Sequence, residues 1–237
     1  MPPSRTTSKA AAPSLSIVER YSSPEDAAAA LMTLLANFAT RARIPDIARK
    51  VGMLEVPLNA STQRGTSGNA QNLVVAVFDL DDTLLEASSG LPIPAMVALA
   101  HAVHNRGGEV HIVTARLEDP EARAETEAQI RGLGLPFATG ARLTLTPARH
   151  RTDLAKVSKF KAATRLKIAR ALGVPVLLTL GDAWSDAVCM DNEETLDELD
   201  EACGGSDTIC LVRLGGEGTG TFYGLKLNER RRDYEDE

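Results

Sequence analysis

The chain has 237 residues, which is enough for one large domain or for a domain with an appendage. Its hydrophobic fraction of 43% and charged fraction of 24% are ordinary for a globular protein and argue against a collagen-like or fully disordered chain. A net charge of −6 argues against a dedicated nucleic-acid coat, although a local basic patch would still permit a nucleic-acid partner.

The composition also bears on compartment. No apolar run approaches the ~18–20 residues that a spanning helix needs, and the first residues lack the apolar segment of a secretory signal. Three cysteines, Cys189, Cys203 and Cys210, are too few and too unevenly spaced for a disulfide framework or a zinc site. We therefore expect a cytoplasmic protein without a membrane partner.

The N-terminal third divides into three segments. Residues 1–22 are rich in Ser, Pro, Thr and Ala without periodicity, which predicts a flexible arm. Ser23 as N-cap, Pro24 at the first helical position and apolar residues at helical spacing predict a helix inside a helical extension over residues 23–58. The polar stretch over residues 59–72 predicts a linker, which leaves residues 73–237 as the main domain.

In the main domain, apolar strands alternate with helices. The predicted strands are Leu73–Phe78, Val110–Thr114, Arg142–Leu145, Val174–Leu180 and Thr208–Leu214. The predicted helices are Pro94–Asn105, a segment from Asp119 to Gly132–Gly134, Ser158–Leu172 and part of Asp186–Cys203. This alternation is typical of an α/β protein with a Rossmann-like, doubly wound and mostly parallel sheet, in which ligands bind beyond the carboxyl ends of the strands.

The sharpest chemical signal is the acidic sequence that follows the first of these strands. Asp79, Asp81 and Asp82 come directly after it, and three carboxylates at a buried strand end repel one another and lose hydration. A hard cation such as Mg²⁺ would offset both costs. Asp79 and Asp81 point the same way in extended chain, so both can face one reacting phosphorus. A helix-capping turn is the alternative, which the buried strand and the apolar residues after Thr83 disfavour.

Two more strand ends supply related groups. One ends in Thr114, and another leads into Asp182 and Asp186, which lie four residues apart at the entry to a helix. Lys161 and Arg165 lie at i, i+4 on one face of the helix between those strands. Carboxylates, a hydroxyl and a basic helix are thus predicted at one edge of the sheet.

These residues resemble a known family. The order Asp79-x-Asp81-x-Thr83, Thr114, Lys161 and Asp182-x-x-x-Asp186 is similar to the four motifs of the haloacid dehalogenase (HAD) superfamily of phosphohydrolases. The stretches Val77–Leu85 and Gly181–Asp186 look most like its acid-phosphatase branch, subfamily III, which includes vegetative storage proteins and class B and C acid phosphatases. The resemblance covers roughly residues 72–227. It implies a HAD-like domain. The gaps of 35 residues from Asp79 to Thr114 and 47 residues from Thr114 to Lys161 are too short for a large cap domain beside their own helices and strands, and in this superfamily a missing cap implies an open site.

The resemblance also implies roles for single residues. Asp79 would be the nucleophile that forms an aspartyl-phosphate, and Asp81 the general acid and base. Mg²⁺ would be held by the Asp79 carboxylate, the Asp81 backbone carbonyl and Asp182. Thr114 and Lys161 would bind the phosphoryl oxygens.

Other groups would support this machinery. Asp186 would orient Lys161 or a water on the metal ion, and Thr83 would lie behind the reacting groups. Lys159 competes with Lys161 for the phosphate. Two alternatives stay open for Arg116, a substrate contact or a salt bridge at the surface, and two for Trp184, stacking on a substrate or packing in its loop.

Three functions are compatible with these residues. The first is a Mg²⁺-dependent phosphatase that hydrolyses small phosphomonoesters or nucleotides. The second is a phosphatase acting on a macromolecule, either a polynucleotide 3′-phosphate or a phosphoprotein; the open site favours it, and the net charge disfavours a nucleic acid. The third is a non-catalytic storage or phosphate-binding relative, which the presence of Asp79 disfavours.

Overall fold

The computed structural model describes residues 18–40, 74–150, 153–173, 177–187, 193–205, 208–216 and 220–227. The predicted linker over residues 59–72, the second half of the helical extension and most of the predicted arm lie outside these residues. In the described part of the chain, no helix combines the length and apolar character that crossing a membrane requires.

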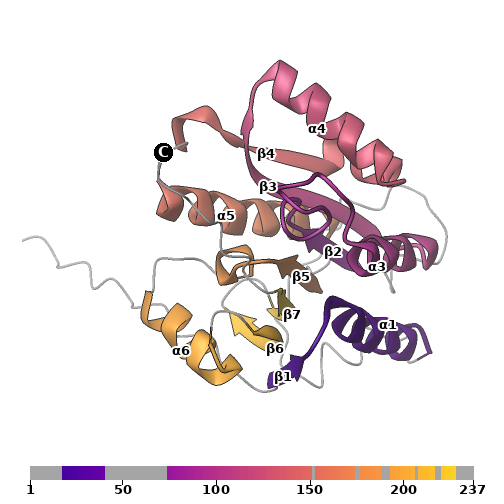
Figure 1. Cartoon of the computed structure of the whole chain (residues 1–237), viewed down its shortest axis with the longest axis vertical. Helices are drawn as coiled ribbons and strands as arrows, with labels where there is room; N and C mark the ends of the chain where they lie inside the picture. The colour runs from indigo at the N-terminus through magenta and orange to yellow at the C-terminus, as the bar shows by residue number, and fades with distance from the viewer. Residues whose placement is uncertain are drawn as a thin grey trace, which may run out of the picture.

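One seven-stranded sheet organises the molecule, in the order β1-β6-β7-β5-β2-β3-β4 (Figure 1). The strands are β1 (Val18–Tyr21), β2 (Val75–Phe78), β3 (Glu109–Glu118), β4 (Leu143–Pro147), β5 (Leu178–Gly181), β6 (Ile209–Gly216) and β7 (Gly220–Lys226). The strands from β7 to β4 in this order pair in parallel, whereas β6 is antiparallel to both β7 and β1. The predicted α/β fold with a mostly parallel sheet is confirmed.

Helices cover both faces of the sheet. They are α1 (Pro24–Thr40), α3 (Pro94–Asn105), α4 (Pro120–Gly132), α5 (Leu154–Leu172) and α6 (Glu193–Cys203). The side chains of β2 alternate between the faces: Ala76 and Phe78 belong to the core that α1 and α3 share, and Val75 and Val77 pack with Ile168 of α5. A strand buried on both faces explains the continuous apolar sequence, and the sheet is doubly wound.

Short-range signals set the ends of the helices. The Asp119 carboxylate accepts a hydrogen bond from the Ala122 backbone N–H at 2.9 Å and caps α4. Asp153 caps α5 in the same way, at 3.0 Å from the Lys156 nitrogen, so this helix starts four residues before the predicted Ser158. Gly173, with φ of 69°, ends α5 in the left-handed conformation that favours glycine.

The N-terminal segments differ from the prediction. Residues 18–21 are the edge strand β1, paired antiparallel with β6, so the flexible arm predicted over residues 1–22 extends too far. The helix of the predicted extension, α1, is also part of the main domain, because Ala27, Leu31 and Leu35 are buried in its principal core. The main domain therefore starts well before residue 73. Pairing with a distant strand stabilises β1, and its own short sequence carries no sign of that partner.

Two features near the C-terminus were not predicted. Strand β7 contains two glycines, and its sequence lacks the apolar run that marks β2. Cys203 and Cys210, both fully buried, form a disulfide between the end of α6 and the start of β6, with 5.8 Å between their Cα atoms. The cysteine count argued only against a framework of several disulfides, and it missed this single bond.

Candidate active site

The candidate site lies where parallel strands end. Asp79 follows β2, and its backbone N–H donates to the carbonyl of Leu180 in β5 at 2.8 Å. Because β2 and β5 are parallel neighbours, the residues that follow them emerge at one edge of the sheet. This topology brings Asp79 next to the loop that carries Asp182 and Asp186.

Lys161 of α5 bridges these two strand ends. Its Nζ lies 2.9 Å from Oδ1 of Asp79 and 2.5 Å from Oδ1 of Asp186, and all three side chains are at most 7% exposed. Arg165, one turn further along α5, donates to the backbone carbonyl of Asp186. Lys159 is exposed and lies off this face of α5, so Lys161 is the lysine that contacts Asp79.

Three carboxylates converge around this lysine. One oxygen from each of Asp79, Asp182 and Asp186 lies within 4.8 Å of the others. Burial, together with the charges of Asp186 and Asp182, raises the pKa of Asp79 to about 8, although Lys161 opposes the shift. Burial and the neighbouring Asp186 raise the pKa of Asp182 to about 7. The protein surroundings therefore disfavour the ionisation of all three carboxyl groups at once.

The pKa of Lys161 moves in the direction that keeps it charged. Burial alone lowers this pKa, but the charges of Asp186 and Asp79 and their hydrogen bonds outweigh burial and raise it above its usual range. Lys161 is thus a fixed cation inside a buried acidic cluster, suited to meet the oxygens of a phosphoryl group.

The donor set fits a hard divalent cation. Carboxylate oxygens are the ligands that Mg²⁺ prefers, and a bound cation reverses the electrostatics that raise the pKa values of Asp79 and Asp182. These two residues stand on adjacent strand ends and can share one ion, while Asp186 is already engaged by Lys161.

Gly181 permits the close approach of Asp186 to β5. A Cβ atom at position 181 would stand 2.0 Å from Oδ2 of Asp186, a distance that no side chain tolerates. The Ala183 backbone N–H also donates to this oxygen at 3.3 Å. The sequence Gly181-Asp182 is therefore needed for Asp186 to turn back toward Lys161.

The Asp81 carboxylate forms a bidentate salt bridge with Arg116. The guanidinium donates from Nε to Oδ2 at 2.9 Å and from Nη2 to Oδ1 at 2.7 Å. Arg116 is itself held by the side chains of Thr126 and Gln129 on α4. Of the two alternatives for Arg116, the structure shows a salt bridge, and this salt bridge is made to a candidate catalytic residue.

The two candidate threonines are fully buried. Thr114 lies within β3, which continues to Glu118, and its Oγ1 accepts from the Arg116 backbone N–H at 3.3 Å. Thr83 has a buried Oγ1 without a hydrogen-bond partner among the described residues. Asp82 has a structural part, since its φ is 54° and its Oδ1 accepts from the Ala87 N–H at 2.9 Å.

Trp184 packs in its loop. It is 4% exposed, and its Nε1 donates to Oδ1 of Asp200 on α6 at 2.9 Å. Asp200 also accepts from Nζ of Lys226, and sequence reasoning singled out neither partner.

The fold and the site are similar to those of HAD-like phosphohydrolases. Residues 86–198 match the family model of the HAD superfamily, subfamily IIIB (Acid phosphatase). Over these residues the chain resembles the acid phosphatases of the HAD superfamily, which confirms the predicted resemblance and supports the activity of a phosphoric monoester hydrolase. The matched range contains Thr114, Lys161 and the Asp182–Asp186 loop, and it begins just after the segment that carries Asp79 and Asp81. No curated protein sequence matched the chain significantly.

Proposed function

We propose that the chain is a Mg²⁺-dependent phosphomonoesterase that works through an aspartyl-phosphate at Asp79. One observation carries the proposal: Nζ of Lys161 joins Asp79 to Asp186 inside a buried cluster that also contains Asp182. A nucleophile, a fixed cation and carboxylates that can hold a metal ion thus occupy one strand edge.

The first step is attack on phosphorus. An oxygen of Asp79 forms a bond to phosphorus while the ester P–O bond breaks, and the leaving oxygen takes a proton from Asp81. Arg116 donates one hydrogen bond to each oxygen of Asp81 and so orients this carboxyl group, whose remaining lone pairs can carry the proton. Lys161 stabilises the negative charge on the phosphoryl oxygens, and Thr114, on the neighbouring strand β3, would also bind them.

The second step releases phosphate. Water attacks phosphorus and gives its proton to Asp81, and the bond to Asp79 breaks to yield inorganic phosphate and the free carboxylate. A bound Mg²⁺ supplies charge stabilisation and orientation of the phosphoryl group. The carboxylates of Asp79 and Asp182 and the backbone carbonyl of Asp81 would hold it, and Asp186 fixes Lys161.

The segments between the candidate site residues favour an open site. The described residues between Asp79 and Thr114 form a short loop, α3 and the start of β3; those between Thr114 and Lys161 form α4, β4 and the start of α5. These elements belong to the sheet and its covering layers. This arrangement admits a phosphorylated macromolecule as a second candidate substrate beside small phosphomonoesters and nucleotides.

Phosphate release tests the function. An aryl phosphate should be hydrolysed with Mg²⁺ and not in EDTA, and return of Mg²⁺ should restore the rate. A panel of nucleotides, sugar phosphates, phosphopeptides and 3′-phosphorylated oligonucleotides then ranks the substrate classes. Full activity in EDTA would overturn the metal assignment, and no release from any substrate would overturn the proposed function.

A further inference from the structure

The loop that carries Asp182 and Asp186 is anchored from a helix outside the catalytic cluster. Trp184 opens the short helix η6 (Trp184–Asp186), midway between the two acidic residues. Its indole Nε1 donates to Oδ1 of Asp200 at 2.9 Å, across a sequence separation of 16 residues. A side chain of α6 thus binds the residue at the centre of the loop.

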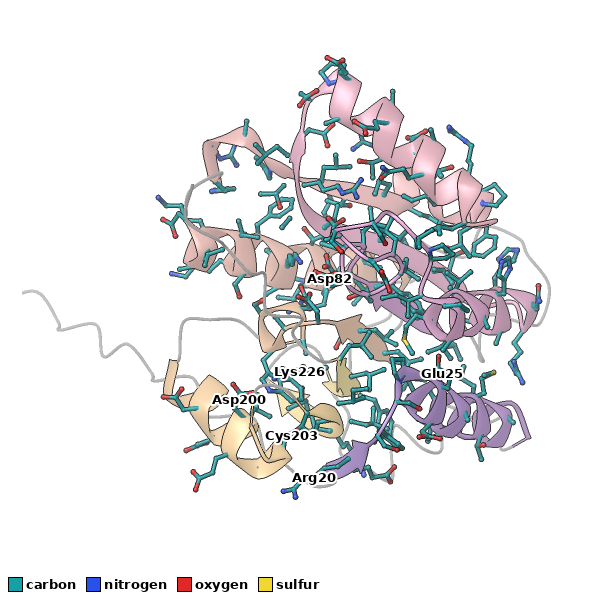
Figure 2. The ribbon with its side chains drawn as sticks, viewed as in Figure 1. Arg20, Glu25, Asp82, Asp200, Cys203 and Lys226 are labelled. Carbon is teal, nitrogen blue, oxygen red and sulfur yellow. A yellow bond between two sulfur atoms is a disulfide. The ribbon has the colours of Figure 1, made fainter. Side chains whose placement is uncertain are left out.

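The same carboxylate oxygen holds a buried lysine. Nζ of Lys226 donates to Oδ1 of Asp200 at 2.9 Å and lies 5.9 Å from the centre of the Trp184 ring. The Lys226 side chain is only 2% exposed, so the nearby carboxylate contributes to offsetting the cost of burying its charge. Figure 2 labels Asp200 on α6 with Lys226 beside it.

Lys226 also sits beside the strand end that leads into the loop. It pairs with Gly181 in the β5–β7 register, and the Leu227 N–H donates to the Gly181 carbonyl at 2.8 Å. Asp200 therefore joins two segments that flank the acidic loop, the end of β7 and Trp184.

Packing around the indole leaves it little freedom. Trp184 shares a buried cluster with Ala187, which follows η6, and with residues of α6 and β6, namely Leu199, Cys203, Cys210, Val212 and Leu214. Gly224 of β7 leaves room for this cluster, because a Cβ there would lie 3.1 Å from Cβ of Ala187. The ring is confined by packing, and the hydrogen bond to Asp200 selects its orientation.

We propose that Asp200 is a positioning residue, which orients Trp184 and thereby sets the placement of Asp182 for cation binding and of Asp186 for holding Lys161. This inference rests on the proposed function only in taking those carboxylates as part of the metal and phosphate site. Asp200 acts through Trp184 and touches no reacting atom. Loss of an outer partner of this kind commonly weakens metal binding by about 10–100-fold.

Metal binding tests the inference without turnover. Mn²⁺ affinity, measured by electron paramagnetic resonance of the free ion, is compared in the wild type, Asp200→Ala, Asp200→Asn and Asp197→Ala. Asp197 lies exposed on the same helix and provides the matched control. Asp200→Ala should weaken binding about tenfold or more. Asp200→Asn keeps an oxygen acceptor for the indole and should restore most of the affinity, and Asp197→Ala should bind as the wild type does.

A purely structural role of Asp200 predicts different results. If Asp200 only held α6 to the sheet, Asp200→Ala would lower the melting temperature and leave the Mn²⁺ dissociation constant of the folded protein unchanged, which overturns the inference. Equal loss of affinity in Asp200→Asn and Asp200→Ala also overturns it, because the indole acceptor would then be irrelevant.

A second variant covers the case in which Asp200→Ala does not fold. Trp184→Phe keeps an aromatic ring in the packed cluster and removes only the N–H donor, so it should weaken Mn²⁺ binding to a similar extent. Unchanged affinity in Trp184→Phe overturns the inference. A wild type that binds Mn²⁺ through Asp182 but hydrolyses no phosphate ester contradicts the proposed function alone, and a wild type that binds no Mn²⁺ overturns the inference as well.

Discussion

Lys161 is the residue on which the arrangement of the carboxylates depends. Its ammonium group lies between the carboxylates of Asp79 and Asp186, and all three side chains are almost completely buried. Without this ammonium group, the charges of the two carboxylates would repel each other with no cation between them. The lysine therefore stabilises the site, and in the proposed function it also binds the phosphoryl group.

Replacing Lys161 should be far more costly than replacing Lys159. We expect Lys161→Ala to lower the rate of phosphate release by about 10²–10³, because a positioned charge is lost from the site. Lys159→Ala is the matched control on the exposed side of α5 and should change the rate less than about threefold, in line with the small effect of surface charges. Both variants are checked for folding by circular dichroism. A dead Lys159→Ala enzyme beside an active Lys161→Ala enzyme would contradict the assignment.

Arg116 controls the orientation of the candidate acid. The guanidinium fork occupies both oxygens of Asp81, and contacts from α4 fix the fork in turn. The hydrogen bond and charge of Asp81 also raise the pKa of Arg116, although burial opposes this shift. Arg116 is thus a permanent cation at the acid's side of the site.

We expect Arg116→Lys to impair the hydrolysis of alkyl phosphates more than that of aryl phosphates. A lysine offers a point charge in place of a planar fork, so Asp81 loses its fixed orientation. Alkyl alcohols are poor leaving groups and need the proton from Asp81, whereas activated phenols leave without it. The measurement compares kcat for the two substrate types in variant and wild type. Equal losses on both would show that Arg116 does not act through Asp81.

The buried carboxylates also predict how stability varies with pH. In the metal-free protein the pKa of Asp182 is raised to about 7, above its ordinary value of 3.8. A carboxyl group whose pKa is higher in the folded than in the unfolded state stabilises the fold at low pH, and this contribution is lost as the pH rises through the folded value.

We therefore expect the melting temperature of Asp182→Asn, measured in EDTA, to rise relative to the wild type between about pH 4 and pH 8. Comparison with the variant removes the opposite contribution of His111, whose pKa burial lowers. Mg²⁺ should raise the melting temperature of the wild type at the upper end of this pH range, because a ligand that binds only the folded state stabilises that state. A difference in melting temperature between variant and wild type that stays constant across this pH range would contradict the raised pKa of Asp182.

At the scale of elements, β1 shows how a short segment gains its structure. Its four residues pair with β6, and the Arg20 side chain donates to the Ala202 carbonyl at the end of α6 at 2.8 Å. The strand therefore connects the edge of the sheet to the helix that carries Asp200. Edge pairing of this kind adds backbone hydrogen bonds that the isolated segment cannot make.

Removing β1 should lower stability. A chain that starts at residue 22 is expected to melt several degrees below a matched chain that starts at residue 18, because only the former loses the β1–β6 ladder. The measurement is thermal unfolding followed by circular dichroism, with phosphate release as a second readout. Identical melting temperatures would mean that β1 contributes nothing to the fold in solution.

The sequence predicted elements best where local signals were complete. Helix α3 starts at Pro94 and ends at Asn105 as expected, since proline and the glycines after Asn105 mark its two ends. Strand β7 was missed because Gly220 and Gly224 interrupt its apolar pattern, and β1 because only pairing with β6 defines it. Elements whose stability comes from distant partners carry little local signature.

At the scale of the whole molecule, topology explains which parts of the site were foreseeable. Parallel strands end at one edge of the sheet, so Asp79 and the Asp182–Asp186 loop could be placed together from the strand pattern alone. The Arg116–Asp81 pair spans 35 residues, and its geometry depends on how β3 continues past Thr114. The contacts of Asp200 depend on how α6 lies against the end of β7, and no sequence motif predicts that arrangement.

The central claim is that Asp79 forms a covalent phosphoenzyme, and its capture is the most direct test. The Asp81→Asn variant is mixed with an aryl phosphate and Mg²⁺, quenched in acid, and its peptides are analysed by mass spectrometry. Asp82→Asn serves as the matched control, since asparagine tolerates the positive φ at this position and keeps the acceptor for Ala87. The account predicts one phosphoryl group on the peptide that carries Asp79 in Asp81→Asn, and none when Asp79→Asn is added. A phosphoryl group on another residue, or normal turnover by Asp79→Asn, would contradict it.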